Sequence, residues 1–254
     1  MEHFVRMFNK TKFLPDKYAV SARIVPVVLS LLPWLVYFFV KVSLDVSNWW
    51  FGPILAISLV IAAEHIGRTF GKKQEAKLFE VWGGMPSVAM LRHRDKRIDS
   101  MTKLRYHKFL QESVPNLSVP TPEEEAKQPE FADQGYSAAC SWLREQTRDK
   151  EKFHLLTEEN INYGFRRNIF GLKPFTITLD LLLVALHICL LVLMSIELQW
   201  METVPTSLFE SMGISFIALM HLLIVVFIIN PGWVRTQAET YAKRLLSSCD
   251  ELQK

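Results

Sequence analysis

The sequence has few cysteines, and the three it has, Cys140, Cys189 and Cys249, lie far apart. They form no CxxC pair, so the sequence predicts neither a disulfide framework nor a zinc site, and we expect three small buried hydrophobes. The net charge is also low, +3 over 254 residues, which is too small to favour nucleic acid as a partner. Neither a metal nor a cofactor is expected.

The sequence motifs of several enzyme classes are absent as well. The chain has no Walker A loop, no Rossmann glycine spacing, no GxSxG elbow and no HExxH helix. His93-Arg94-Asp95 spells the kinase catalytic triplet, but Ser100 stands where that loop needs a metal-binding asparagine. No kinase-type glycine-rich loop or DFG triplet accompanies it. The sequence therefore predicts a protein that is not an enzyme.

What the sequence does have is four long apolar stretches. Each is about 18–23 residues long, enough to cross a ~30 Å hydrocarbon core at 1.5 Å per helical residue. Backbone groups in lipid must be satisfied within the segment, so each stretch predicts a helix. The expected fold is an all-α integral membrane protein with four transmembrane helices and a helical cytoplasmic domain between spans 2 and 3. The four spans are Ile24–Ser43, Trp49–Ile66, Phe175–Ile196 and Leu208–Asn230.

The positions of lysine and arginine predict the orientation. Of the 29 basic residues, 19 lie between the second and third spans, within residues 67–174. The short connection 41–48 has only Lys41, and the connection 197–206 has none. Because positive residues stay on the cytoplasmic side, we expect both termini and the middle domain to be cytoplasmic. The expected location is a plasma membrane, specifically a bacterial inner membrane.

These patterns divide the chain into five parts and predict several helices in the middle one. The parts are a cytoplasmic amphipathic arm (1–23), transmembrane helices 1 and 2 (24–66), a helical cytoplasmic domain (67–174), transmembrane helices 3 and 4 (175–230) and a cytoplasmic helical tail (231–254). The predicted features of the domain are an extension of the second span that ends at Trp82, helices Pro86–His93, Asp99–Glu112 and Pro129–Arg148, a capping box at Thr121–Glu124, and a helix Thr157–Phe170 that ends at Gly171.

Ionisable residues inside the apolar stretches are costly in lipid and are functional candidates by default. Asp180 and His187 are seven residues apart, so they share one face of the third span. His187 and His221 lie at nearly the same depth, about 20 Å from the cytoplasmic end at 1.5 Å per residue. The two imidazoles could meet across a helix pair or surround a pore in an oligomer. We predict pore or gating roles for His187, His221, Asp180 and Glu64, with a packing role as the alternative.

Two basic patches at the cytoplasmic side could bind an anionic ligand. A glycine pair before a helix exposes backbone N–H groups, and nearby arginines can hold a phosphate or carboxylate. The same residues suit lipid headgroups or salt bridges to the acidic stretch 123–125. The candidate ligand-binding residues are Gly83, Gly84, Arg92, Arg94, Arg166 and Arg167.

The layout of the chain resembles small bacterial defence-type membrane effectors, in which a cytoplasmic sensing domain controls a bundle that permeabilises the inner membrane. Four spans without an internal repeat do not favour a transporter, so we expect a homo-oligomer around a shared axis. The leading hypothesis is a ligand- or partner-controlled passage for ions. The alternative is a membrane-anchored scaffold that recruits a soluble protein. A third hypothesis, an enzyme acting on lipid headgroups through Glu64 and His65, lacks a visible nucleophile.

Overall fold

The computed structural model describes residues 16–41, 52–198 and 206–253. Within these residues the secondary structure is helical and contains no strand, so the expected all-α class is confirmed. The predicted amphipathic arm lies mostly outside the described residues. The chain separates into two compact units: unit 1 comprises Met1–Lys72 and Gly164–Asn230, and unit 2 comprises Lys73–Tyr163 and Pro231–Lys254.

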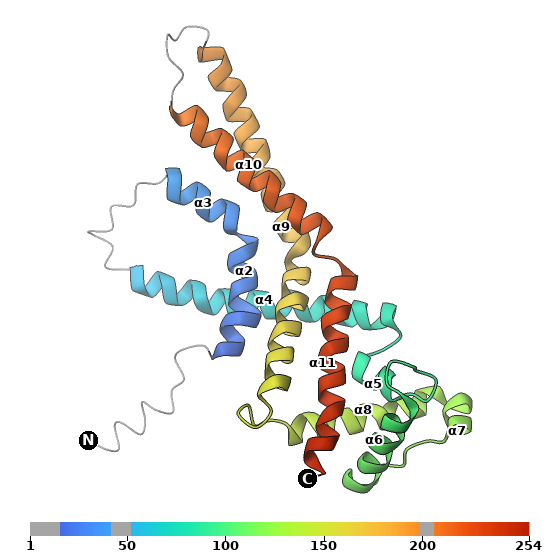
Figure 1. Cartoon of the computed structure of the whole chain (residues 1–254). Helices are drawn as coiled ribbons and strands as arrows, with labels where there is room; N and C mark the ends of the chain where they lie inside the picture. Colours follow the sequence, from blue (N-terminus) through green and yellow to red (C-terminus); the bar gives the residue numbers. More distant parts are fainter. Residues whose placement is uncertain (1–15, 42–51, 199–205, 254) are drawn as a thin grey trace, which may run out of the picture. The chain divides into compact units, whose positions relative to one another are not determined.

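The first apolar stretch of unit 1 is not one straight helix. A π-helical turn, η1 (Ala19–Ile24), leads into α2 (Val25–Ser30), and α3 (Leu32–Lys41) follows (Figure 1). The axis bends by 59° between the segments on either side of this break. Pro33 explains the bend, because it has no N–H to donate and its ring collides with the carbonyl one turn earlier.

Three longer helices contribute to unit 1, and one of them corrects a prediction. The sequence predicts a helix end at Gly171, but the helix runs through Gly171 and Pro174 without a break. A Cβ atom on Gly171 would lie 2.6 Å from the backbone carbonyl of Phe70. Gly171 is therefore a residue of close helix approach rather than a helix stop. The three helices are α4 (Gly52–Trp82), α9 (His154–Leu198) and α10 (Thr206–Phe227).

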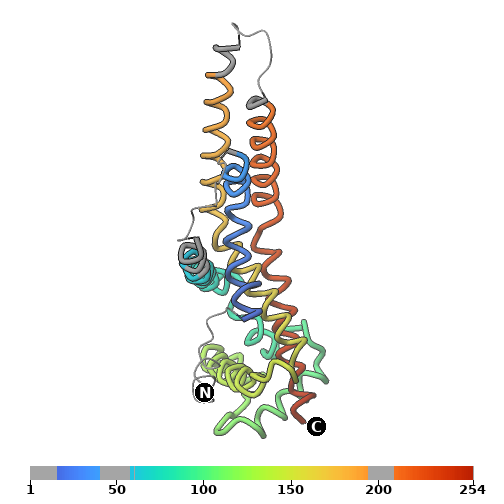
Figure 2. Tube along the Cα trace, turned by 90° about the vertical axis from the view of Figure 1, so that its left-hand side faces the viewer, coloured from blue at the N-terminus to red at the C-terminus, as the bar shows by residue number. Residues whose placement is uncertain are grey.

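Glycines on α4 allow this helix to run across α2 and α9 at close range (Figures 1 and 2). A Cβ atom on Gly67 would overlap the carbonyl oxygen of Arg23, and one on Gly71 would overlap the side chain of Asn168. The Asn168 amide in turn donates a hydrogen bond to the carbonyl of Ala22. The backbones of α4, η1 and α9 thus meet at small residues, as in packed membrane helices.

Two described helical segments are long and apolar enough to cross a membrane: His154–Leu193 of α9 and Phe209–Phe227 of α10. The bent pair formed by Ala19–Ser30 and Leu32–Val40 is a third if it counts as one span. Helix α4 is not among these segments, and its predicted span begins outside the described residues. The structure therefore supports two or three candidate membrane helices.

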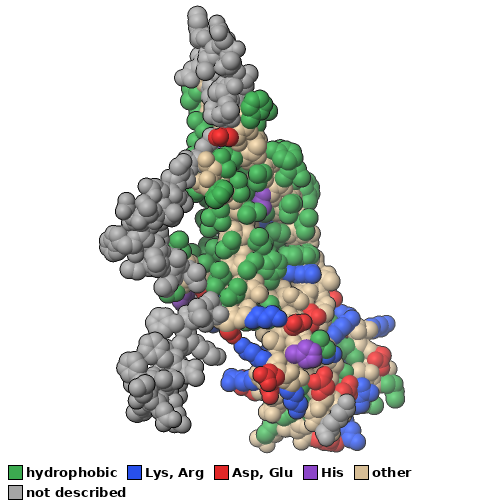
Figure 3. Space-filling view, turned by 60° about the vertical axis from the view of Figure 1, so that its left-hand side comes forward, with side chains coloured by type: hydrophobic (Ala, Val, Ile, Leu, Met, Phe, Trp, Pro, Cys, Tyr) green, Lys and Arg blue, Asp and Glu red, His purple; other side chains and the backbone are tan. Residues whose placement is uncertain are grey.

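The outer surfaces of α9 and α10 support membrane association. Figure 3 shows hydrophobic side chains gathered over the helices of unit 1, whereas charged side chains are spread over unit 2. An apolar face this continuous is unusual for a surface in contact with water. The exposed residues on it include Leu182, Ile188, Val192, Phe216, Ile224 and Phe227.

Unit 2 has its own core, built from short helices that the sequence largely predicts. Helix α4 ends at Trp82 as expected, and the capping box is confirmed, because Thr121 Oγ1 accepts from the Glu124 N–H while the Glu124 carboxylate accepts from the Thr121 N–H. The remaining helices are α5 (Pro86–Leu91), α6 (Ser100–Ser113), α7 (Pro122–Lys127), α8 (Pro129–Gln146) and α11 (Pro231–Leu252).

Helix α11, which the sequence predicts as a tail, belongs to the core of unit 2. Leu245 and Leu246 are fully buried there, together with Leu143 of α8. Cys140 and Cys249 are buried hydrophobes of the same core, as expected, whereas Cys189 of unit 1 is exposed. The helical domain of this protein therefore includes its C-terminal segment.

The close approach of α4 and α9 predicts the effect of adding one methyl group. Gly171→Ala should destabilise unit 1 by about 1–3 kcal/mol, because the new Cβ meets the backbone of Phe70 and neither helix backbone can yield cheaply. Gly213→Ala is the matched control, since a Cβ on Gly213 meets no described atom within 4 Å. Thermal unfolding of the detergent-solubilised protein measures both variants. Equal unfolding midpoints for Gly171→Ala and Gly213→Ala would contradict the close approach of α4 and α9 at Gly171.

Candidate functional site

The most unusual polar group in unit 1 is Asp180 of α9. It is fully buried, and its Oδ2 lies 2.8 Å from Nδ1 of His221 on α10 in a hydrogen bond. An ionised carboxylate can only accept hydrogen bonds, so the Nδ1–H of His221 is the donor. The other carboxylate oxygen, Oδ1, is buried without a hydrogen-bond partner. Asp180 therefore keeps one bare acceptor atom.

His187, two turns further along α9, is the second such group. It is also fully buried, and its Nδ1 lies 2.8 Å from the carbonyl oxygen of Leu183. A carbonyl can only accept, so Nδ1 carries the hydrogen and Nε2 of the neutral ring is an acceptor. Nε2 has no partner, and the ring stands edge to face against Tyr37 of α3 at 5.4 Å between centroids. His187 thus also presents a bare acceptor.

Apolar side chains separate these two acceptors. Leu183 lies one turn after Asp180 and one turn before His187, and it is fully buried. It packs with Ile214 and Ala218 of α10. We call Leu183, Ile214 and Ala218 the apolar plug. Trp34 and Tyr37 of α3 and Val184 of α9 pack against the plug.

The structure therefore separates residues that the sequence places together. His187 and His221 share a depth in the prediction, but the contact that forms is His221 with Asp180. Glu64, the fourth predicted pore or gating residue, forms an ion pair with Arg23. A sequence gives helix depth from residue counts, but it does not say which neighbour each side chain meets.

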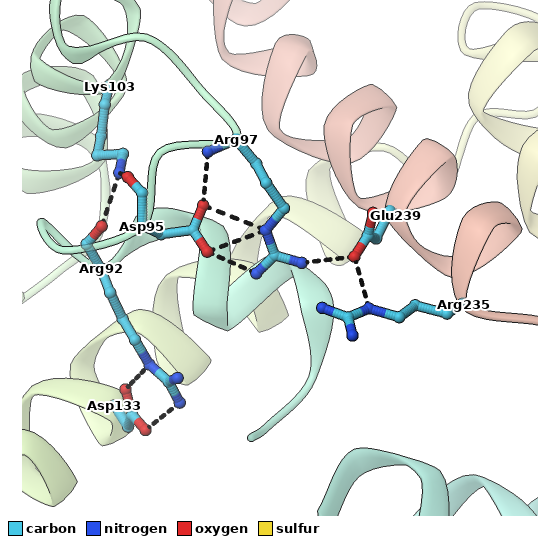
Figure 4. Close-up of polar contacts among 7 residues, drawn as sticks. All are labelled: Arg92, Asp95, Arg97, Lys103, Asp133, Arg235 and Glu239. Carbon is cyan, nitrogen blue, oxygen red and sulfur yellow. Dashed lines mark hydrogen bonds and ion pairs between the residues drawn. The ribbon is translucent and has the colours of Figure 1, made fainter. Parts of the chain in front are cut away.

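In unit 2 the candidate Arg92 is held by an internal ion pair. Its guanidinium donates two hydrogen bonds to Asp133 of α8, at 2.8 and 2.6 Å (Figure 4). Its carbonyl accepts from Nζ of Lys103 at 2.7 Å. A second pair joins Arg97 to Asp95, at 2.6 Å. Arg92 thus ties the end of α5 to α8, and an anion that bound it would compete with Asp133.

The glycine pair closes a helix. Gly83 and Gly84 have φ values of +74° and +122°, which favour glycine. The Gly84 N–H donates to the carbonyl of Phe79 and the Gly83 N–H to that of Glu80, which is the Schellman pattern at a helix C-terminus. The sequence predicts that the N–H groups of Gly83 and Gly84 bind an anionic ligand. In the structure these N–H groups instead donate to carbonyls of α4.

The remaining predicted residues are divided between the units. Arg94 of unit 2 is exposed. Arg166 and Arg167 belong to the part of α9 in unit 1, where Arg167 is buried and its Nε donates to Asn168 Oδ1 at 3.1 Å. The six predicted ligand residues therefore fall into two sets, one in each unit.

Unit 2 contains a pocket of about 670 Å³ that the sequence reasoning missed. Its polar lining includes His93, which follows Arg92, and Lys103 and His107 on α6. Lys103 and His107 are four residues apart, so a helix places them on one face. This spacing is the sequence signal that could have indicated the polar side of the pocket. The full lining is His93, Asp95, Lys96, Ile98, Asp99, Ser100, Met101, Lys103, Leu104, His107 and Pro122.

Buried polar groups beside this pocket bond to the chain around them. Nε2 of His107 lies 2.7 Å from the carbonyl of Leu91, and burial lowers the pKa of His107 to about 4. Burial also lowers the pKa of Lys103, whose Nζ donates to the carbonyls of Arg92 and Asp95. Burial alone would raise the pKa of Asp95, but hydrogen bonds from Arg97 outweigh it and the pKa is lowered.

Glu125 of α7 is an acidic residue among these buried polar groups. It is buried, and its Oε2 accepts from the Tyr136 hydroxyl and from the His93 N–H, each at 2.8 Å. Burial and this carboxylate raise the pKa of Tyr136. Across the described ranges, no group of three or more His, Cys, Asp or Glu side chains is arranged to hold a metal ion.

Comparison of the chain with protein-family models, with curated proteins and with solved structures finds no match.

The buried neutral His107 predicts how stability depends on pH. The unfolded chain takes up a proton at this residue near pH 6.5, whereas the folded chain resists protonation down to about pH 4. The free energy of unfolding of unit 2 should therefore fall as the pH is lowered through this window, by up to about 1.4 kcal/mol per pH unit. His107→Gln, which keeps a donor for Leu91, should flatten this dependence.

Amide hydrogen exchange of α6 in the full-length protein at pH 7, 6 and 5 measures the effect. His154→Gln, at an exposed histidine, is the control and should leave the pH dependence unchanged. An unchanged slope in His107→Gln would assign the pH dependence to other groups.

Proposed function

We propose that this protein is an integral membrane protein with four spans that assembles as a homo-oligomer and passes ions under the control of unit 2. In this proposal the membrane is a bacterial inner membrane, both termini are cytoplasmic, and unit 2 binds an anionic ligand or a soluble protein. The spans are the bent α2–α3 pair, the first half of α4, the apolar half of α9, and α10. The layout resembles that of small membrane effectors of bacterial defence, and in this proposal the protein acts in such defence, including antiviral defence.

One observation supports ion passage above a purely anchoring role. Asp180 and His187 are fully buried among apolar helices, and each leaves a polar atom without a partner. Leaving a buried acceptor unpaired costs about 1–3 kcal/mol, a cost that a simple anchor has no reason to bear. Buried ionisable groups in spans typically mark ion or proton pathways.

The chain connections support control by unit 2. Two of the boundaries between the units fall inside helices, after Lys72 in α4 and after Tyr163 in α9. A rearrangement of unit 2 on ligand binding would therefore act on segments that are covalently continuous with the candidate spans. The pocket beside His93 and His107, rather than the already paired Arg92, is the better candidate for the ligand.

Ion flux from liposomes that contain the full-length protein tests this proposal. A pH-sensitive dye and a K⁺-sensitive dye together report passage of either ion. The double variant His187→Leu/His221→Leu should lower the flux at least about tenfold without preventing insertion, because it removes both buried imidazoles. His154→Leu controls for loss of a histidine, because His154 is exposed and belongs to unit 2 rather than to the apolar half of α9.

Equal flux in the wild type and the double variant would remove these histidines from the pathway. The absence of flux in every sample would instead favour the second candidate, a scaffold that recruits a soluble protein. A specific observation supports that candidate: unit 2 has a complete core of its own, and Met101, Leu104 and Phe131 are exposed on its surface.

A further inference from the structure

The two bare acceptors and the apolar plug between them, taken together, point to one ion. We infer that the ion this protein passes is the proton, that Asp180 and His187 bind it in turn, and that the apolar plug closes the path between them. This inference rests on the proposed function and names its substrate.

The chemistry of the two atoms favours a proton. Asp180 Oδ1 and His187 Nε2 are both basic lone pairs, and neither has a partner. A proton needs a single lone pair, whereas K⁺ must exchange its hydration shell for several oxygen ligands. Each position offers one acceptor, and the two stand about 10.5 Å apart along α9, seven residues at 1.5 Å each.

The neighbouring groups stabilise each protonation state. On Asp180 the facing titratable group is His221 of α10, and on His187 it is Tyr37 of α3. A proton on Oδ1 converts the carboxylate to a carboxylic acid while Oδ2 keeps its bond to His221. A proton on Nε2 converts the ring of His187 to an imidazolium while Nδ1 keeps its bond to the Leu183 carbonyl.

The plug explains why the path is closed in this structure. Leu183 lies between the two acceptors on α9, and Ile214 and Ala218 of α10 pack with it, all three buried. Transfer over about 10.5 Å needs water between the two groups, and an apolar constriction excludes water. When the plug opens, a water molecule accepts the proton from Oδ1 and the next donates one to Nε2. Release of that proton on the far side restores the neutral ring.

The test opens the plug by mutation, so that no trigger is needed. Leu183→Ser in the full-length chain should raise proton flux into liposomes about tenfold or more, because it admits water, and should leave K⁺ flux unchanged. Leu183→Ala tests the same change without adding a polar group. Leu182→Ser is the matched control, because Leu182 is the adjacent residue and is 56% exposed.

A second substitution in the opened chain tests the acceptors. Asp180→Asn combined with Leu183→Ser should return proton flux to the level of Leu182→Ser, because an amide keeps the shape of the side chain but does not take up the proton. His187→Gln in the same background should do likewise. Proton flux that survives both changes would overturn the assignment of these residues.

The remaining outcomes separate this inference from the proposed function. Comparable K⁺ flux through Leu183→Ser would overturn the proton assignment and leave ion passage standing. If folded Leu183→Ser and Leu183→Ala pass neither ion, the apolar plug does not close a path. If the wild type also passes neither ion, the proposal of ion passage is overturned as well.

Discussion

Unit 1 depends on one constraint: every hydrogen-bonding group between apolar helices needs a partner within the protein. Serine and threonine side chains bond back to the carbonyl one turn earlier, as Ser30 does to Pro26 and Thr178 to Pro174. Lys173 donates to the carbonyls of Val226 and Ile229 at the end of α10. Among the described residues, three buried side-chain atoms are exceptions: Arg23 Nε, Asp180 Oδ1 and His187 Nε2. The two acceptors, Asp180 Oδ1 and His187 Nε2, lie on one helix, α9, and call for a functional reason.

The same constraint organises unit 2 with different residues. Lys103 and His107 project from one face of α6 and bond to carbonyls at the end of α5 and in the segment after it. Glu125 does the same for the His93 N–H. These buried groups connect the short helices of the unit, and Lys103 and His107 also line the pocket. Binding of a ligand there would act directly on the contacts that hold the unit together.

Packing at small residues sets how close the helices of unit 1 come. The backbone of α4 reaches η1 and α9 only because Gly67, Gly71 and Gly171 have no side chains. In the sequence, Gly171 has the signature of a helix end, since glycine before proline is typical of one. The structure uses the same residue for close approach, and α9 continues past Pro174. A local signal was therefore overridden by a tertiary contact.

Local patterns in the sequence determined the helices. The length of the apolar stretches, the capping box at Thr121 and the glycine pair after Trp82 are each readable within a few residues, because helix ends depend on nearby backbone and side-chain groups. The tertiary structure alone decided the partners. Asp180 with His221, Arg92 with Asp133 and α11 with α8 join residues far apart in sequence, and residue spacing contains no information on such contacts.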